Sequence, residues 1–287
     1  MKRIAILGPG LLGGSVALAL RADPAVEVRL WARREEAVEE ARALEIAHLA
    51  TCSLEHALVG ADTVLLCVPV GAMAELAHKA LPFLSPDTLV TDVGSVKDPV
   101  CRALAPVLQG RAHFVGSHPM AGSEKAGIAA ARADLFTGAV CILTPEEGVT
   151  PAAAVLRATE LWERLGCRIR SLAPLVHDQV CALISHLPHL TAAALVNTVG
   201  TVYPDAFGFC GPGFRDTTRV AAGLPAMWTE ILSSNSQAVA ASLRSFIAVL
   251  EKTAGYLEKS SPSAEAELNH FLAIAKKRRD TLQPVSV

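Results

Sequence analysis

The sequence predicts an α/β fold in which a doubly wound parallel sheet is followed by an all-α domain. Over the first 171 residues, short apolar segments of β type alternate with helical patterns, and this alternation is typical of a doubly wound sheet. After Leu172 the β pattern stops and only helical patterns follow. We therefore expect two domains, residues 1–171 and residues 172–287.

The first domain is predicted to contain seven strands with helices between them. The strand segments are apolar throughout instead of alternating, which indicates a parallel sheet covered on both faces. The predicted strands are residues 2–7, 26–31, 63–68, 88–93, 112–116, 140–143 and 167–171. The predicted helices are residues 11–21, 35–44, 71–81, 96–108 and 155–165.

The second domain is predicted to contain helices at residues 174–187, 225–234, 237–257 and 264–279. Pro188 should end or kink the first of them. The helix at 237–257 carries a wide apolar stripe. A homodimer through this domain would cover the stripe, although a purely intramolecular core would give the same pattern. The residues of the stripe are Val239, Leu243, Phe246, Ile247, Leu250 and Leu257.

Composition excludes several classes of protein. The 26 basic and 28 acidic residues nearly cancel, so no electrostatic surface for nucleic acid or an anionic membrane is expected. We also find no segment of about 18 apolar residues without a charge or a helix breaker. The seven cysteines are scattered and odd in number, which indicates reduced thiols and no structural zinc site. These features predict a cytoplasmic protein without a metal ion.

A glycine-rich loop, Gly8-Pro9-Gly10-Leu11-Leu12-Gly13, directly follows the first predicted strand and opens the first helix. Its glycines allow a tight turn, close approach to a pyrophosphate and close packing of helix on strand. The helix N-terminus adds free N–H groups for phosphates. In this context the loop predicts a Rossmann-type dinucleotide site. The expected contacts are Gly8, Gly10, Leu11, Leu12 and Gly13, with Val68 and Pro69 after the strand at 63–68.

The end of the second predicted strand indicates which coenzyme is bound. A carboxylate there would bind the ribose hydroxyl of NAD, but the chain has Ala32, Arg33 and Arg34, with no acid before Glu35. Two arginines suit a 2′-phosphate, so these three residues are assigned to the coenzyme site and NADP is favoured over NAD. The alternative is that the arginines only begin the next helix and pair with its acids, residues 35–40.

Further polar motifs follow two strands of the first domain and recur in the second. Asp92-Val93-Gly94-Ser95-Val96-Lys97 and Gly116-Ser117-His118-Pro119-Met120-Ala121-Gly122-Ser123-Glu124-Lys125 lie at predicted carboxyl ends of strands, where open α/β sheets bind ligands. Ser185-His186-Leu187-Pro188-His189 and Phe214-Arg215-Asp216-Thr217-Thr218-Arg219 lie in the helical part. In this order and spacing, the motifs resemble those of the prephenate and arogenate dehydrogenase family of tyrosine biosynthesis.

The resemblance implies oxidative decarboxylation of a cyclohexadienol small molecule by a nicotinamide coenzyme, with the second domain serving substrate binding and dimerisation. His118 matches the catalytic histidine, and a neutral imidazole suits removal of a hydroxyl proton. Ser95 matches a serine that hydrogen-bonds this histidine and the substrate. Arg219 matches the arginine that binds the ring carboxylate, for which a guanidinium is well shaped. His189 matches a contact to the substrate side chain.

Two further residues are assigned to substrate binding with an alternative for each. Asp216 orients Arg219 or forms an exposed pair with it at spacing i,i+3. Glu124 influences the choice between keto and amino substrates or is a solvated loop residue. His186 is assigned a structural role, and His177 and Asp178 a role in helix packing only.

Two other functions would suit a dinucleotide domain followed by helices. A β-hydroxyacid-type dehydrogenase would use a catalytic lysine in the helical domain, but no lysine lies between Lys125 and Lys252. A non-enzymatic NAD(P)H-sensing module would have no need for Ser95, His118 and Arg219 to converge on one cleft.

Overall fold

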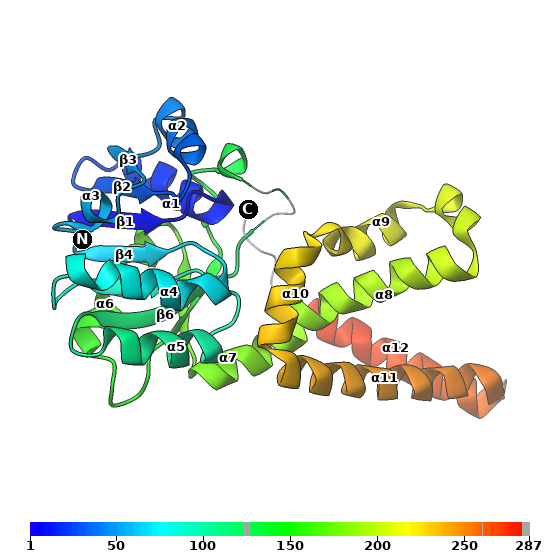
Figure 1. The fold of residues 1–287 in the computed structure, drawn as a ribbon. Helices are drawn as coiled ribbons and strands as arrows, with labels where there is room; N and C mark the ends of the chain where they lie inside the picture. The colour runs from blue at the N-terminus through cyan, green and yellow to red at the C-terminus, as the bar shows by residue number, and fades with distance from the viewer. Residues whose placement is uncertain (123–124, 126, 260, 283–287) are drawn as a thin grey trace.

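The computed structural model describes residues 1–122, 125, 127–259 and 261–282. An eight-stranded sheet with helices on both faces forms one body, and a helical part extends away from it (Figure 1). The strands are β1 (Arg3–Leu7), β2 (Glu27–Trp31), β3 (Leu49–Thr51), β4 (Thr63–Leu66), β5 (Leu89–Asp92), β6 (His113–Pro119), β7 (Val140–Thr144) and β8 (Arg168–Ser171).

The strand order is β3-β2-β1-β4-β5-β6-β7-β8. The first strand therefore lies inside the sheet. Strands β2 and β3 are added on one side of β1, and β4 and the later strands are added on the other side, as in a doubly wound fold. The pairs from β3 to β6 are parallel, but β6 and β7 pair antiparallel and β8 runs parallel to β7. The predicted all-parallel sheet is thus only mostly parallel.

The reversal at β7 follows from the segment that precedes it. For the next strand to run parallel, the chain must cross back to the end of the sheet where the previous strand began, usually through a helix. After Pro119 the chain instead packs across the start of α1 (Leu11–Arg21), where the Arg132 backbone N–H donates to Ser15 Oγ at 2.9 Å. The chain re-enters the sheet from that same edge, so β7 must run backwards.

Alternate side chains of the strands face two apolar clusters. In β1, Ile4 and Ile6 face a cluster with α1, α2 (Glu35–Ala43) and α6 (Ala152–Arg164). Ala5 and Leu7 face the other cluster, with α3 (Leu54–Leu58), α4 (Val70–Ala80) and α5 (Asp98–Leu108). Both faces are buried, which confirms the interpretation of the uniformly apolar strands.

The helices α1 and α10 (Pro225–Ser234) have the predicted bounds, and most other predicted elements differ by one or two residues. The sequence analysis missed β3 and α3 because segments of three and five residues show little periodicity. A local signal for α3 existed in Ser53, whose side chain caps the helix by accepting the His56 N–H.

The helix that begins at Pro174 was predicted to end or kink at Pro188, but helical structure continues beyond this residue to Val202. The helix α7 (Pro174–Cys181) passes through a π turn (Ala182–His186) into α8 (Leu187–Val202). A proline lacks the N–H for a helical bond and its ring collides with the preceding turn. The wider π turn immediately before Pro188 relieves that collision, so the helix continues.

The remaining helical part comprises η4 (Pro204–Phe209), α9 (Pro212–Thr218), η5 (Arg219–Ala222), α10, α11 (Ser236–Lys259) and α12 (Pro262–Asp280). The stretch Pro174–Val202 is long and apolar enough to cross a membrane by length and composition. However, it carries the buried polar residues His177, Asp178 and His186, and it packs against α5 and α11. Its first half is therefore packed within the folded chain, although only 28% of its most apolar window is buried.

Candidate active site

The glycine loop forms a tight cradle at the point where the strand order reverses. Gly8 has φ +121°, and a side chain there would overlap the Cys67 carbonyl oxygen next to Val68. A side chain at Gly13 would overlap the Gly8 carbonyl oxygen. Gly10 precedes α1, and no side chain caps this helix. The free N–H groups at the helix start can therefore hold a phosphate.

The structure separates the three residues assigned to the end of β2. Ala32 is 2% exposed and packs in the apolar cluster, so its methyl group cannot face a ligand, which corrects that part of the assignment. Arg33 and Arg34 are exposed and form no ion pair within the described residues. Glu35 pairs with Arg42 instead. The alternative in which these arginines pair with the acids of α2 therefore has no support in the structure.

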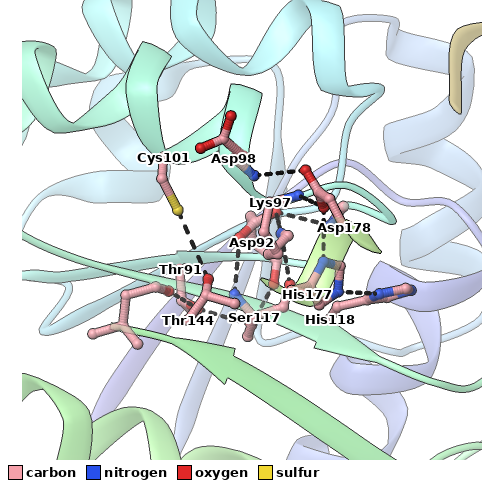
Figure 2. Close-up of polar contacts among 12 residues, drawn as sticks. Thr91, Asp92, Lys97, Asp98, Cys101, Ser117, His118, Thr144, His177 and Asp178 are labelled. Carbon is pink, nitrogen blue, oxygen red and sulfur yellow. Dashed lines mark hydrogen bonds and ion pairs between the residues drawn. The ribbon is translucent and has the colours of Figure 1, made fainter. Parts of the chain in front are cut away.

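A buried ion pair joins the segments that follow β5 and flank β6. Lys97 Nζ bonds to Asp92 Oδ2, and it also donates to the Ser117 carbonyl oxygen at 2.9 Å. Asp92 Oδ1 accepts the Ser117 N–H at 3.0 Å (Figure 2). These bonds fix β6 against the end of β5, and they set the position of the next residue, His118.

His118 heads a chain of hydrogen bonds that reaches into the helical part. Its Nδ1 lies 2.8 Å from His177 Nε2, and His177 Nδ1 lies 2.8 Å from Asp178 Oδ1 (Figure 2). Asp178 also accepts the backbone N–H groups of Lys97 at 2.7 Å and Asp98 at 2.9 Å. The sequence analysis missed this chain, although an adjacent His-Asp pair in an otherwise apolar helix was a signal for it.

The electrostatics of this cluster favour neutral imidazoles. Burial, with the neighbouring His177 and Lys97, holds the pKa of His118 well below its usual value. Burial also lowers the pKa of His177, and the hydrogen bond that His177 donates to Asp178 opposes that shift. Near neutral pH, His118 is therefore unprotonated and able to accept a proton.

Cys181 lies beside the two histidines, with its Sγ 3.3 Å from His177 Nε2. Potential ligand atoms of His118, His177 and Cys181 lie within 4.8 Å of one another, which is close enough to surround a metal ion. However, burial raises the pKa of the Cys181 thiol to about 12, and the 2.8 Å contact between the histidines is a hydrogen bond. We interpret the group as a hydrogen-bonded cluster.

Ser95 lies in the loop between β5 and α5 and is half-buried. The bond expected between Ser95 and His118 is not formed among the described residues, where His118 bonds to His177 instead. Ser95 follows β5, and His118 lies near the carboxyl end of the neighbouring parallel strand β6, so both lie at the carboxyl edge of the sheet.

The helical part supplies a second polar group. The His189 ring stacks on Trp228, with centroids 3.6 Å apart and planes 9° apart, and its buried Nδ1 has no hydrogen-bond partner among the residues that the structure describes. Arg219 begins η5, which packs against α8, and it is exposed. Asp216 is also exposed and forms no ion pair among the described residues, so the expected orientation of Arg219 by Asp216 is not seen. Glu124 lies outside the described residues.

A phosphate cradle, a buried neutral histidine at the same edge of the sheet and a helical part that completes the cluster define a nicotinamide-dependent dehydrogenase. The model of the prephenate dehydrogenase nucleotide-binding domain matches residues 16–171, and that of the prephenate dehydrogenase dimerization domain matches residues 173–273. The chain belongs to the prephenate dehydrogenase family. This assignment favours neither the β-hydroxyacid-type dehydrogenase nor the non-enzymatic sensor.

Individual relatives are similar over nearly their whole length. The cyclohexadienyl dehydrogenase of Zymomonas mobilis is 39% identical over 96% of this chain and 95% of its own. The prephenate dehydrogenase of Aquifex aeolicus, solved with hydroxyphenyl propionate and NAD+, is 33% identical over 99% of both chains, with a TM-score of 0.90. The arogenate dehydrogenase of Synechocystis is 30% identical over 97% of this chain and 99% of its own, with a TM-score of 0.83.

Proposed function

We propose that this chain oxidatively decarboxylates prephenate, arogenate or both in tyrosine biosynthesis, with His118 as the general base. The products are 4-hydroxyphenylpyruvate from prephenate and tyrosine from arogenate. The observation that carries the proposal is the position of His118: a buried, neutral imidazole at the sheet edge that also holds the glycine cradle. The Aquifex aeolicus relative holds a phenolic ligand and NAD+ together, which supports this reading.

The residues fit the steps of this reaction. The glycine cradle would hold a nicotinamide coenzyme, which would supply the acceptor for the hydride that leaves C4 of the ring. His118 takes the proton of the C4 hydroxyl, so the C4–O bond becomes a carbonyl. Loss of CO2 from C1 then returns the electron pair to the ring, which becomes aromatic, and the phenol oxygen recovers its proton from His118. The reaction transfers one hydride and releases CO2, and it leaves no net proton behind.

We assign the substrate contacts to both parts of the chain. Arg219 binds the ring carboxylate before it is lost, and the planar guanidinium can do so with two parallel bonds. His189, whose buried Nδ1 has no partner within the described part of the chain, contacts the substrate side chain. Ser95 reaches the hydroxyl when substrate is present. Asp216 and Glu124 complete the proposed set at the side-chain end.

For the coenzyme, we propose the contacts Gly8, Gly10, Leu11, Leu12, Gly13, Val68 and Pro69, with NADP favoured over NAD. The preference is supported by the lack of a carboxylate at the end of β2 and by Arg33 and Arg34, which are exposed and form no ion pair with any residue that the structure describes. The relative solved with NAD+ shows that the family fold accepts the coenzyme without a 2′-phosphate. The choice therefore depends on local residues of this chain.

We further propose a cytoplasmic homodimer with residues 1–171 as the coenzyme domain and residues 172–287 as the substrate and dimerisation domain. Exposed apolar side chains on α8 and α11, among them Leu195, Val202, Ile247 and Leu250, support a partner surface in the helical part. All seven cysteines are free thiols, as expected in a reducing compartment.

The decisive experiment measures coenzyme reduction by its near-ultraviolet absorbance, with prephenate or arogenate and with NADP or NAD. We expect at least one substrate to reduce coenzyme with release of CO2. The proposal fails if neither substrate is oxidised by protein that binds coenzyme. The ratio of kcat/KM values in the four assays gives the substrate and coenzyme preferences directly.

A further inference from the structure

We propose that His177 and Asp178 are positioning residues that share the proton which His118 takes from the substrate. The inference rests on the proposed function, because it requires His118 to be the base. In this view His118, His177 and Asp178 form one reservoir, which stores the proton during decarboxylation and then returns it to the product.

The hydrogen bonds determine which nitrogen carries each proton. Asp178 accepts three donors, two of them backbone N–H groups, and such bonds favour the ionised carboxylate. His177 must then donate its Nδ1–H to Asp178. A neutral His177 has only a lone pair on Nε2, so the 2.8 Å contact requires that His118 donate its Nδ1–H. The lone pair of His118 therefore lies on Nε2, the nitrogen that is left to receive the substrate proton.

The reaction makes storage necessary. The proton leaves the C4 hydroxyl during hydride transfer and is needed again only when the phenol oxygen forms. Meanwhile a buried imidazolium at His118 would lie near the positive charge of Lys97. Moving the charge to His177 places it on the ring that is hydrogen-bonded to Asp178, and this carboxylate opposes the effect of Lys97.

The transfer is balanced atom by atom. When His118 Nε2 binds the substrate proton, the proton on His118 Nδ1 moves to His177 Nε2 across the existing hydrogen bond. One N–H bond breaks and one forms. His118 becomes neutral again, and His177 becomes an imidazolium paired with Asp178. The reverse shift frees the proton on His118 Nε2 for the phenol oxygen, and all three side chains return to their first state.

Several ionisable groups surround this pair. Asp92 ends β5, and Lys97 lies between β5 and α5. Cys181 lies one turn after His177 along α7, and His186 lies in the π turn. The Asn235 side chain donates to the Asp178 carbonyl oxygen at 2.8 Å and lies 3.2 Å from His186 Nδ1. His186 is thus held away from the relay, although it is equally buried.

This difference supplies matched variants for a test. His177→Gln keeps an oxygen that can accept the His118 Nδ1–H, but an amide cannot hold the transferred proton. His177→Leu removes both functions. His186→Gln makes the same change at an equally buried histidine outside the relay. For each protein we would measure coenzyme binding, kcat/KM against pH, and the single-turnover rate in mixtures of H2O and D2O.

For the wild type, we expect a plot of the single-turnover rate against the D2O fraction to be curved, because two protons move in the same step. His177→Gln should lower the single-turnover rate by roughly 10- to 100-fold and make this dependence linear, with coenzyme binding unchanged. His177→Leu should be slower still and should move the pH limb of kcat/KM. His186→Gln should keep the curved dependence and the wild-type pH profile.

A linear dependence in the wild type, or a His177→Gln variant with the wild-type rate and curve, would overturn the proposal. If His177→Leu does not fold, His177→Gln alone decides. Failure of the proposed function looks different: the wild type would oxidise neither substrate, or His118→Asn would remain fully active.

Discussion

Lys97 and Asp92 form an ion pair in which both side chains are completely buried. Each partner also makes a hydrogen bond to Ser117, so all three belong to one network beneath the candidate active site. A buried pair need not stabilise a fold more than apolar residues would, but loss of one partner strands the other charge away from water.

Lys97→Met should therefore lower the free energy of unfolding by about 3–5 kcal/mol, because the carboxylate of Asp92 would remain buried without its cation. Urea denaturation measures this loss. Lys79→Met is the matched control: its pair with Glu75 is exposed and should contribute less than about 1 kcal/mol. Equal stability of the two variants would show that Asp92 is satisfied by the backbone alone.

His118→Asn should lower kcat on the order of 10²–10⁴-fold and leave coenzyme binding nearly intact, since a general base acts on the chemical step. Ser95→Ala should cause a smaller loss of the same kind, because a serine can orient the base but does not accept the proton. Steady-state kinetics with a parallel coenzyme titration test both. An His118→Asn enzyme with normal kcat would remove His118 from the mechanism.

Arg219→Ala should chiefly raise KM, by about 10–150-fold, which corresponds to the loss of one charge-assisted contact. Arg219→Lys should restore only part of the affinity, because an ammonium cannot reproduce a two-pronged contact. The control is Arg215→Ala, one turn earlier on the same exposed stretch. If the Arg215 variant loses substrate affinity and the Arg219 variant does not, the ring carboxylate is bound by Arg215.

Stability should fall as the pH is lowered below about 6.5. Burial depresses the pKa of His118, His177 and His189, and it lowers that of His186 to about 4. Below about pH 6.5 these histidines therefore bind protons in the unfolded chain but stay neutral in the folded chain. The stabilisation that they contribute above the unfolded pKa is lost as the pH falls. His186 alone accounts for up to about 3 kcal/mol of this loss.

Urea denaturation at several pH values between about 7 and 4 measures this slope. His186→Gln should make the slope shallower, since one of the depressed histidines is gone. A stability independent of pH over this range would mean that the histidines titrate normally in the folded protein.

The wild-type kcat/KM should favour NADP, and the preference should shrink as salt screens the arginines. The double change Arg33→Ala and Arg34→Ala should reduce kcat/KM for NADP by about 10–100-fold relative to NAD. Arg279→Ala, an exposed arginine at the end of α12, is the control. A wild-type preference for NAD of about tenfold at low salt would show that both arginines are ordinary surface charges.

Sequence patterns were sufficient for most of the fold. Uniformly apolar strands, the glycine loop and helical spacing predict the strands and α-helices from β1 to α6, except β3 and α3, and the change to helices after Leu172. The antiparallel β7 was not predictable, because its residues are as apolar as those of a parallel strand. Its direction is determined by how residues 127–139 pack on α1, which is a tertiary effect.

The sequence was sufficient to propose candidate site residues, but it did not predict the contacts among them. The resemblance of the motifs selected His118, Ser95, His189 and Arg219 as candidates, but it did not predict the bond from His118 to His177. These histidines are separated by 59 positions, and only the docking of α7 against β6 brings them together. Ala32 was assigned to the coenzyme from its place in the chain, whereas the pleat of β2 turns its methyl group into the core.

The π turn at Ala182–His186 has a consequence for how this chain can change during evolution. A π turn holds one more residue than an α-helical turn of the same rise, and the residues after it are rotated by about 100° relative to a regular helix. Deletion of one residue here would leave each half helical but turn His189 away from Trp228 while His177 stayed in place. Length variation should therefore be confined to surface loops, and variants shortened within this turn should fold without binding substrate.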